Sequence, residues 1–343
     1  YPLTYDSGSI KNLRPGDFVI VPFGKDKEIG IIWDKIEESR KNFKIKSIEE
    51  RIQDLTINES LINFINWFSS YNLISKGKVL KMFLGNKNNI TKIEKKQNFK
   101  NNIVPNSFLL NNEQKKSLKD LRSYGNKFNV SMLQGVTGSG KTLVYFERIK
   151  EVLKNKLQVL ILLPEISLTS QFEDRFQKFF GFKPAVWHSK ISLKNKRKIW
   201  QGVMNKNVDL VIGARSSLFL PFKKLGLIIV DEEHDQSYKQ DEGIIYNARD
   251  MAISRALFEG VPVNLITAVP SVETFENIKK NKYNISKLEK RYQDASFPNY
   301  EIIDLNKAKL EKQSWLSKEI IQKVNFHLKK NDQVLFFLNR RGF

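Results

Sequence analysis

From about residue 108 onward, short apolar runs alternate with longer stretches whose apolar side chains recur at helical spacing. The runs have the length and composition of buried strands, and the stretches between them are typical of amphipathic helices. Because strand and helix alternate, the pattern predicts an α/β fold whose parallel sheet is covered by helices on both faces. The predicted strands are residues 130–133, 158–163, 208–212, 225–230 and 261–266.

The front of the chain has a different pattern. Residues 18–22 alternate apolar and polar side chains, and residues 29–33 form a second such run after a turn, so a small β structure is predicted. Residues 58–84 carry apolar side chains at helical spacing and are predicted to be helical. Residues 85–107 are rich in Asn and Lys, which favours a linker or a solvated loop.

The end of the chain begins a further unit. Residues 282–303 are predicted to cross over, and a helix at 317–330 and a strand at 333–338 follow. The sequence then stops directly after a strand, which leads us to expect a truncated second lobe. The expected parts are a β-rich domain with a helical tail at 1–84, a linker at 85–107, a first lobe at 108–281, and a crossover with the start of a second lobe at 282–343.

Composition narrows the setting and the class of partner. The 343 residues include no cysteine, which excludes disulfides and thiolate metal sites within this sequence. No apolar run approaches about 18 residues and no signal peptide is recognisable, so we expect a cytoplasmic protein without a membrane partner. The formal net charge of +21 favours polyanions, although a general bias toward Lys, Asn and Ile accounts for part of the excess.

A complete phosphate-binding loop, GVTGSGKT at residues 135–142, lies between a predicted strand and a predicted helix. Its glycines allow successive backbone N–H groups to converge on phosphate oxygens, and the helix N-terminus adds a positive dipole end. Lys141 is expected to reach the β- and γ-phosphates and to act in catalysis, and the Thr142 hydroxyl to hold Mg²⁺. The expected ATP-binding residues of the loop are Gly135, Thr137, Gly138, Ser139, Gly140, Lys141 and Thr142.

An acidic motif, DEEH at residues 231–234, follows the apolar run at 225–230. Carboxylates at the carboxyl end of a parallel strand face the ligand site of an α/β sheet. We expect Asp231 to bind Mg²⁺ and Glu232 to polarise the attacking water as the catalytic base. His234 would connect this motif to the next one. The alternative is a solvated charge cluster.

Polar loops follow three further strands, at residues 164–169, 213–217 and 267–270. Small hydroxyl residues, backbone N–H groups and an arginine are the groups that make sequence-independent contacts with DNA phosphates. Arg215 is the first candidate for such a contact, and Ser216 and Thr169 are the next. Each loop taken alone favours an ordinary polar turn, and it is their joint occurrence in this order that strengthens the functional interpretation.

Two other segments carry candidate chemistry. Tyr238 and Tyr246 could stack on bases or could pack under a surface loop, and the sequence leaves both open. Lys239 lies beside them as a further DNA candidate. Gln114, about 20 residues before the phosphate loop, could read the adenine edge with its paired donor and acceptor.

Together these motifs resemble the primosomal protein N′ family of replication-restart helicases, within superfamily 2. The resemblance runs in order through nearly the whole chain. The stretches that carry it are residues 21–25, 29–31, 110–114, 135–142, 163–166, 213–216, 231–234, 237–240, 248–250 and 339–343.

The resemblance implies a RecA-like lobe and an ATP-driven 3′-to-5′ DNA helicase that acts in replication restart and primosome assembly at stalled forks. It implies forked and single-stranded DNA, replication-restart proteins and single-stranded-DNA-binding protein as partners. The N-terminal β domain would be the family's pocket for a DNA 3′ end, with Gly24 and Lys46 at pocket positions. Arg340, in the last motif, is a further DNA candidate.

Several departures from the family are visible. Residues 3–5 (LTY) match the family's pocket motif loosely, and 85–107 is too short for the winged-helix domain found there in the family. The family's Ser-Ala-Thr-Pro loop is TAVP at 267–270, with one hydroxyl fewer. A cysteine-rich zinc domain and an arginine finger would follow residue 343, so zinc is expected only in that missing part.

Two other functions remain open besides the helicase. A module that binds forked DNA without unwinding it would fit the altered 267–270 loop and a truncated second lobe. Another superfamily 2 translocase, such as an RNA helicase or a restriction-type motor, would share the ATPase motifs, but the N-terminal β domain argues against it.

Overall fold

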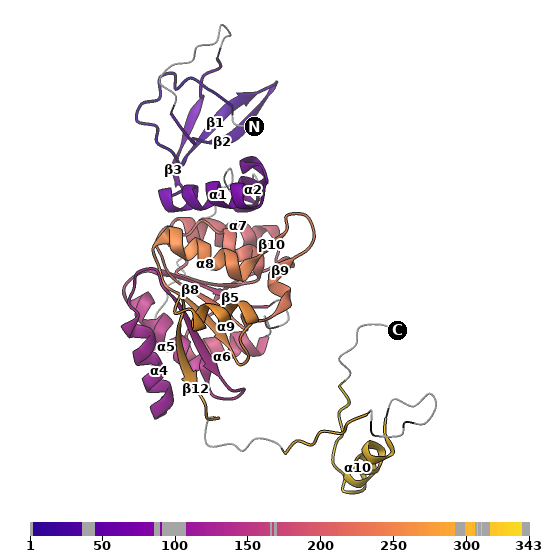
Figure 1. Cartoon of the computed structure of the whole chain (residues 1–343). Helices are drawn as coiled ribbons and strands as arrows, with labels where there is room; N and C mark the ends of the chain where they lie inside the picture. Colours follow the sequence, from indigo (N-terminus) through magenta and orange to yellow (C-terminus); the bar gives the residue numbers. More distant parts are fainter. Residues whose placement is uncertain are drawn as a thin grey trace. The chain divides into compact units, whose positions relative to one another are not determined.

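The structure, a computed structural model, describes residues 3–35, 45–85, 90, 108–164, 167, 170–291, 299–305, 307, 310 and 316–337. The chain divides into two compact units, residues 1–294 and 295–343, which are described separately. The first unit contains an N-terminal three-stranded sheet, a pair of helices next to it and an α/β lobe (Figure 1).

The N-terminal sheet is antiparallel, with strand order β2-β1-β3. Strands β1 (Asp17–Phe23) and β2 (Asp26–Ile31) form a hairpin, which confirms the predicted β structure. Its two-residue turn includes Gly24 with φ +61°, a backbone conformation that favours glycine. Strand β3 (Glu50–Thr56) is not predicted from the sequence because its apolar residues do not alternate.

A buried carboxylate attaches β3 to the hairpin. Asp17 Oδ1 accepts hydrogen bonds from Arg51 Nη2 at 3.0 Å and from Thr56 Oγ1 at 2.9 Å, both from β3. Its Oδ2 accepts from the backbone N–H of Arg14 at 2.9 Å. Burial of Asp17 is therefore compensated by charged and neutral donors.

Two helices, α1 (Glu59–Tyr71) and α2 (Lys76–Leu84), occupy the predicted helical stretch. Asn58 caps α1, since its side chain accepts a hydrogen bond from the Leu61 N–H at 2.8 Å. The single predicted helix is divided because Leu73, with φ +53°, leaves the helical region of the backbone.

The lobe is built on a seven-stranded parallel sheet with the order β12-β4-β11-β8-β5-β7-β6. This confirms the predicted fold class. The strands are β4 (Val130–Gly135), β5 (Gln158–Leu162), β6 (Ala185–Trp187), β7 (Leu210–Gly213), β8 (Leu225–Asp231), β11 (Val263–Thr267) and β12 (Asn284–Leu288).

Helices cover both faces of this sheet. Because side chains alternate along a strand, Leu160 and Leu162 of β5 enter one apolar core and Val159 and Ile161 enter the other. The helices of the lobe are α4 (Asn112–Ser123), α5 (Lys141–Lys154), α6 (Ser170–Phe180), α7 (Leu193–Met204), α8 (Ala248–Glu259) and α9 (Val272–Lys279). Among the described residues, none of the helices is long and apolar enough to cross a bilayer.

Short elements follow two of the strands on the side where the motifs lie. A 3-10 helix, η2 (Arg215–Phe219), follows β7, and a second one, η3 (Gln236–Tyr238), follows the acidic motif. Strands β9 (Lys239–Gln240) and β10 (Tyr246–Asn247) then form a small antiparallel hairpin.

Three expectations from the sequence are corrected. The predicted crossover at 282–303 begins with β12, which pairs with β4, and its polar Ser286 is accommodated by a hydrogen bond to Asp120 Oδ2 at 2.7 Å. Residues 333–337 are not a strand, because no described strand lies beside them to form a ladder. Within the predicted solvated segment 85–107, Ile90 is buried in the core.

The second unit contains α10 (Lys318–Lys329), which confirms the predicted helix at 317–330. Ser317 caps it, because its hydroxyl accepts a hydrogen bond from the Ile320 N–H at 3.3 Å.

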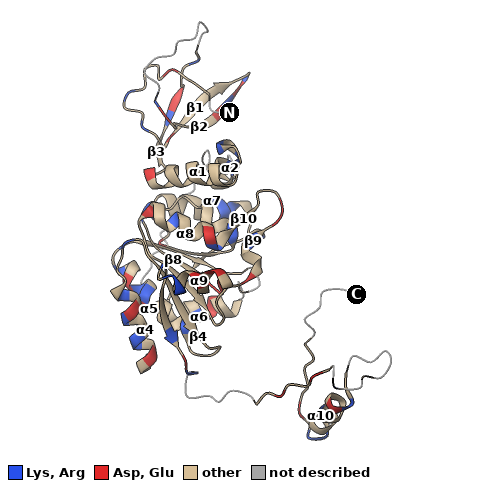
Figure 2. Ribbon diagram, in the orientation of Figure 1, with Lys and Arg blue, Asp and Glu red and all other residues tan. Residues whose placement is uncertain are grey.

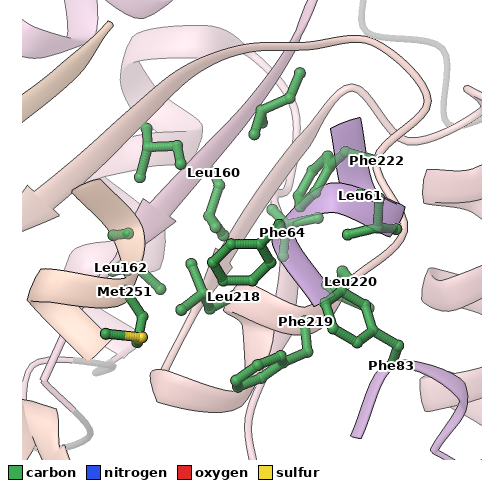
Figure 3. Packing of buried hydrophobic residues seen from close by; sticks show 14 of the residues in the cluster. Leu61, Phe64, Phe83, Leu160, Leu162, Leu218, Phe219, Leu220, Phe222 and Met251 are labelled. Atoms are coloured by element: carbon green, nitrogen blue, oxygen red, sulfur yellow. The ribbon is translucent and has the colours of Figure 1, made fainter. Parts of the chain in front are cut away.

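The N-terminal helices and the lobe share one apolar core (Figure 3). Phe83 of α2 lies edge-on to Phe219 of η2, with ring centroids 5.2 Å apart. Phe64 of α1 packs against Phe258 of α8 at 6.1 Å, and the Trp200 indole N–H donates to the Phe83 carbonyl at 2.7 Å. The N-terminal helices and the lobe are therefore packed together in a single apolar core.

A buried arginine of α8, Arg255, connects this helix to the segments packed beside it. Arg255 of α8 is fully buried and donates to the carbonyls of Leu218 and, at 2.8 Å, of Leu220. Its Nη2 lies 3.5 Å from Glu259 Oε1, and Asn58 donates to the other carboxylate oxygen of Glu259 at 3.4 Å. This network joins α8 to η2 and to the N-cap of α1.

We expect Arg255→Ala to lower the free energy of unfolding by about 3–5 kcal/mol, because it leaves the Glu259 carboxylate without its counterion and two carbonyls without their donor. The double variant Arg255→Met with Glu259→Gln should lose clearly less, since it leaves no buried charge unpaired. Urea denaturation of both proteins measures the difference. Equal losses in the two variants would contradict this account.

Candidate nucleotide and DNA site

The phosphate loop connects the end of β4 to the start of α5. Gly138 and Gly140 have φ of +84° and +80°, where other residues are strained. A Cβ on Gly135 would come within 2.6 Å of Ser139 Oγ, so this glycine is required by close approach. The loop therefore has the backbone that a cradle for phosphates needs.

Lys141, the first residue of α5, folds back over this loop. Its Nζ donates to the Gly135 carbonyl at 2.8 Å. Desolvation lowers the pKa of Lys141, and the charges of Glu232 and Asp231 oppose that shift. The structure thus brings the lysine of the loop within electrostatic reach of both acidic residues.

Asp231 ends β8, two strands away from β4 in the sheet. Its Oδ2 accepts from the Tyr145 hydroxyl at 2.9 Å, and its Oδ1 accepts from the Glu232 N–H at 3.0 Å. Desolvation raises the pKa of Asp231 to about 6, against the Tyr145 hydrogen bond. Tyr145 also hydrogen-bonds Thr142, so one phenol joins the two expected Mg²⁺ ligands.

Glu232 and His234 form the turn after the strand. Glu232 has φ +47°, a left-handed conformation that is costly for a glutamate, and its carboxylate lies 3.6 Å from His234 Nδ1. The same His234 nitrogen lies 2.7 Å from Thr267 Oγ1 at the end of β11. The acidic motif and the 267–270 loop are therefore in direct contact, as the predicted role of His234 requires.

Glu233 has a structural role that the sequence analysis missed. It is buried, and it accepts hydrogen bonds from the Ser271 N–H at 2.7 Å and from Thr274 Oγ1 at 3.0 Å at the start of α9. Arg249 Nη1 approaches it at 3.3 Å. The acidic motif is thereby fastened to α8 and α9. A serine just before a helix, with a threonine three residues later in its first turn, is the signal that could have indicated this cap.

Gln114 is enclosed by the protein. It is 0% exposed, its Oε1 accepts from the Asn111 N–H at 3.0 Å, and its Nε2 donates to the Ser139 carbonyl at 2.9 Å. Both ends of the amide are used inside the protein, and the role of Gln114 in reading the adenine edge stays a prediction. The side chain instead caps α4 and supports the phosphate loop.

Three of the DNA candidates lie together. Arg215 Nη1 donates to the Lys239 carbonyl at 2.7 Å, which joins η2 to the β9–β10 hairpin. Ser216 is exposed, and its hydroxyl accepts from the Trp187 indole N–H at 3.1 Å. The Lys239 ammonium is exposed and lies 3.6 Å from Asp241. Thr169 and Arg340 lie outside the described residues.

Tyr238 and Tyr246 are not available to bases. Tyr238 is 1% exposed, and its hydroxyl donates to the carbonyls of Leu162 and Asp231. Tyr246 is buried against Phe219, with centroids 5.4 Å apart. The stacking interpretation is therefore wrong for this conformation, and packing under a surface loop is the role that the structure gives to both rings.

In the N-terminal sheet, the two expected pocket residues are neighbours. Lys46 Nζ donates to the Gly24 carbonyl at 3.3 Å, and both residues are exposed. The Tyr5 hydroxyl donates to the Pro22 carbonyl at 3.1 Å, so the segment at residues 3–5 lies along the same hairpin.

Comparison with known proteins assigns the family. A profile of DEAD/DEAH box helicases matches residues 111–278, and a profile of the PriA 3′ DNA-binding domain matches residues 1–85. The replication restart protein PriA of Rickettsia felis is 44% identical over 348 residues, which cover 100% of this chain and 52% of that protein. The chain belongs to the PriA family.

More distant PriA proteins match a shorter stretch. The replication restart protein PriA of Haemophilus influenzae is 41% identical over 238 residues, or 69% of this chain and 32% of that protein. The chain spans about half the length of the PriA proteins that match it throughout. The Hef helicase domain of Pyrococcus furiosus superposes on 53% of this chain and 38% of its own with a TM-score of 0.39 and 17% identity, from which nothing further follows.

The residues of this PriA-family loop fit a magnesium nucleotide. The Ser139 hydroxyl is buried, and no described residue hydrogen-bonds it. Glycine at 135 leaves the space next to this hydroxyl free of a Cβ atom. Thr142 and Asp231, linked through Tyr145, supply the one or two oxygen ligands that protein sites usually offer to Mg²⁺ beside phosphates.

The raised pKa of Asp231 predicts a stabilising variant. The folded-state pKa of about 6 lies above the ordinary 3.8, so ionisation opposes folding between these values and the full penalty is present above pH 6. Asp231→Asn should therefore raise the free energy of unfolding by on the order of 1–3 kcal/mol at pH 7.5. At pH 4 the gain should nearly vanish. Urea denaturation at both pH values measures this, and an equal gain at both would contradict the desolvation origin.

Proposed function

We propose that this chain is the 3′-end DNA-binding domain and the first motor lobe of an ATP-driven 3′-to-5′ DNA helicase that acts in replication restart and primosome assembly at stalled forks. The observation that carries the proposal is the convergence of Lys141, Asp231 and Glu232 at the carboxyl ends of β4 and β8 in one sheet. The loop that bears Arg215 follows another strand of the same sheet.

Each side chain then has a defined task. Bound ATP supplies the scissile phosphoanhydride, and its Mg²⁺ neutralises charge on the phosphate oxygens. Lys141 exchanges the Gly135 carbonyl for phosphate oxygens, while Thr142 and Asp231 hold the cation. Glu232 accepts a proton from the attacking water. His234 and Thr267 connect the base to the loop at 267–270.

The division into parts is likewise proposed. Residues 1–84 would receive a DNA 3′ end beside Gly24 and Lys46, residues 85–107 would link, and residues 108–281, extended by β12, would form the first lobe. The remaining residues would begin a second lobe. Arg215, Ser216 and Lys239 would contact the phosphates of a single strand.

The setting follows from the family. The partners would be forked and single-stranded DNA, other replication-restart proteins and single-stranded-DNA-binding protein, in the cytoplasm. In the whole protein, the second lobe would close over the nucleotide and supply an arginine to the transition state. We therefore expect these 343 residues alone to bind ATP weakly and to unwind nothing.

Lys141→Ala in the full-length protein should abolish the ATPase activity that single-stranded DNA stimulates, because the lysine no longer pairs with the phosphates. The matched control is Lys154→Ala, an exposed lysine at the other end of α5, which should leave the rate unchanged. Phosphate release with and without DNA is the measurement. ATPase activity indifferent to DNA, or retained in Lys141→Ala, would refute the proposal.

A further inference from the structure

The segment from residue 175 to residue 208 has one sign of charge only. It contains nine lysines and arginines and no aspartate or glutamate, whereas the whole chain has 37 acidic residues among 343. A general lysine bias would add cations to this segment, but it would not remove the acids from it. By contrast, α4 carries both signs (Figure 2).

Five of these cations, Lys190, Lys194, Lys196, Arg197 and Lys198, lie on α7 and in the loop before it. Ile199, Trp200 and Val203 turn one side of α7 into the core, so Lys194 and Lys198, one helical turn apart, lie on the outward side. Lys196 Nζ donates to the Ser189 carbonyl at 3.1 Å, which holds the loop bearing Lys190 against the helix. Lys190, Lys194 and Lys198 form what we call the α7 lysine surface.

The α7 lysine surface is not neutralised by ion pairs within the described part of the chain. No carboxylate among the described residues forms an ion pair with any of its three lysines, although other surface lysines such as Lys27 and Lys279 have such partners. Unpaired ammonium groups on one helix side release counterions most effectively when they meet a polyphosphate.

Its position lies between the two parts of the unit that are expected to hold DNA. Toward the N-terminal domain, Trp200 of α7 donates to the Phe83 carbonyl and lies edge-on to Phe18 of β1, with centroids 6.4 Å apart. Toward η2, Trp187 at the end of β6 donates to Ser216. The helix and loop that bear the lysines therefore lie next to both of these parts.

The chemistry of the surface favours duplex over single-stranded DNA. Binding of a single strand relies on exposed aromatic platforms as well as cations. The two tryptophans here are unsuited to that, because Trp200 is fully buried and the Trp187 indole is partly buried and engaged with Ser216. A surface that offers ammonium groups without stacking partners reads only the backbone phosphates of a duplex.

We propose that the α7 lysine surface binds the phosphate backbone of a duplex arm next to the fork junction. This inference rests on the proposed action at forks. It adds a duplex contact to the single-strand contacts of Arg215 and the 3′-end contacts of Lys46.

The test is the triple variant Lys190→Ala, Lys194→Ala and Lys198→Ala in the full-length protein. The matched control replaces three exposed lysines of α4, Lys115, Lys116 and Lys119, by alanine and removes the same charge. Fluorescence anisotropy would report the affinity for a short blunt duplex with blocked 3′ ends, over a range of salt concentrations, and for a single-stranded oligonucleotide of the same length.

The α7 variant should weaken duplex binding by about tenfold or more, and should reduce the slope of log affinity against log salt by about 2–3, close to one for each lost phosphate contact. The affinity for the single strand should stay within about twofold of the parent value, since single-strand binding relies on aromatic platforms that the α7 lysine surface does not offer. The α4 control should leave both affinities near those of the parent protein.

Three results would overturn the inference: unchanged duplex affinity in the α7 variant, equal losses in the two triple variants, or a loss confined to the single strand. None of them bears on the ATPase, which is measured separately with Lys141→Ala. Failure of the duplex contact and failure of the helicase proposal are therefore distinguishable.

Discussion

The packing of one aromatic ring, Phe219, governs how the parts of the first unit are held together. Its ring lies edge-on to Phe68 of α1, Phe83 of α2 and Tyr246 of β10, with centroids 5.2–5.4 Å apart. Helices α1 and α2 and strand β10 thus all contact one residue of η2. Edge-to-face contacts of this kind add to the gain from apolar burial, so moving any one segment disturbs the others.

The consequence is that the candidate DNA contacts are set by the core beneath them. Arg215 and Ser216 begin the same 3-10 helix that ends at Phe219. Arg255 donates to the Leu218 carbonyl within this helix and to the Leu220 carbonyl after it. A loop with few buried contacts would be free to move. The η2 segment is instead held by its buried residues Ser217, Leu218 and Phe219, and the side chain of Ser216 at its start is exposed. Helices α1 and α2 form part of that support. The N-terminal domain and η2 are therefore held by the same apolar core.

The sequence predicted the elements whose pattern is strong and missed those that depend on distant partners. Five strands of the lobe follow from apolar runs, but β12 has only two apolar residues and is recognisable only from Asp120 on α4. Residue type also left open which way a side chain points. The sequence left Tyr238 open between stacking and packing and predicted an adenine contact for Gln114. In this structure both side chains are buried supports of the site, because their hydrogen-bond partners lie on other strands or loops. Which acid of the DEEH motif is buried likewise depends on Arg249, which the motif alone does not reveal.

Several features that oppose folding lie at the nucleotide site. Glu232 has a left-handed backbone, the Asp231 carboxylate is desolvated, and the buried Ser139 hydroxyl has no partner among the described residues. Each of these opposes folding by roughly one to a few kcal/mol, and the apolar cores on both sides of the sheet offset them. A triphosphate with its cation would satisfy the hydroxyl and the carboxylate together. The residues expected to bind the nucleotide are therefore also residues that oppose folding. Nucleotide binding would gain part of its free energy by relieving these costs.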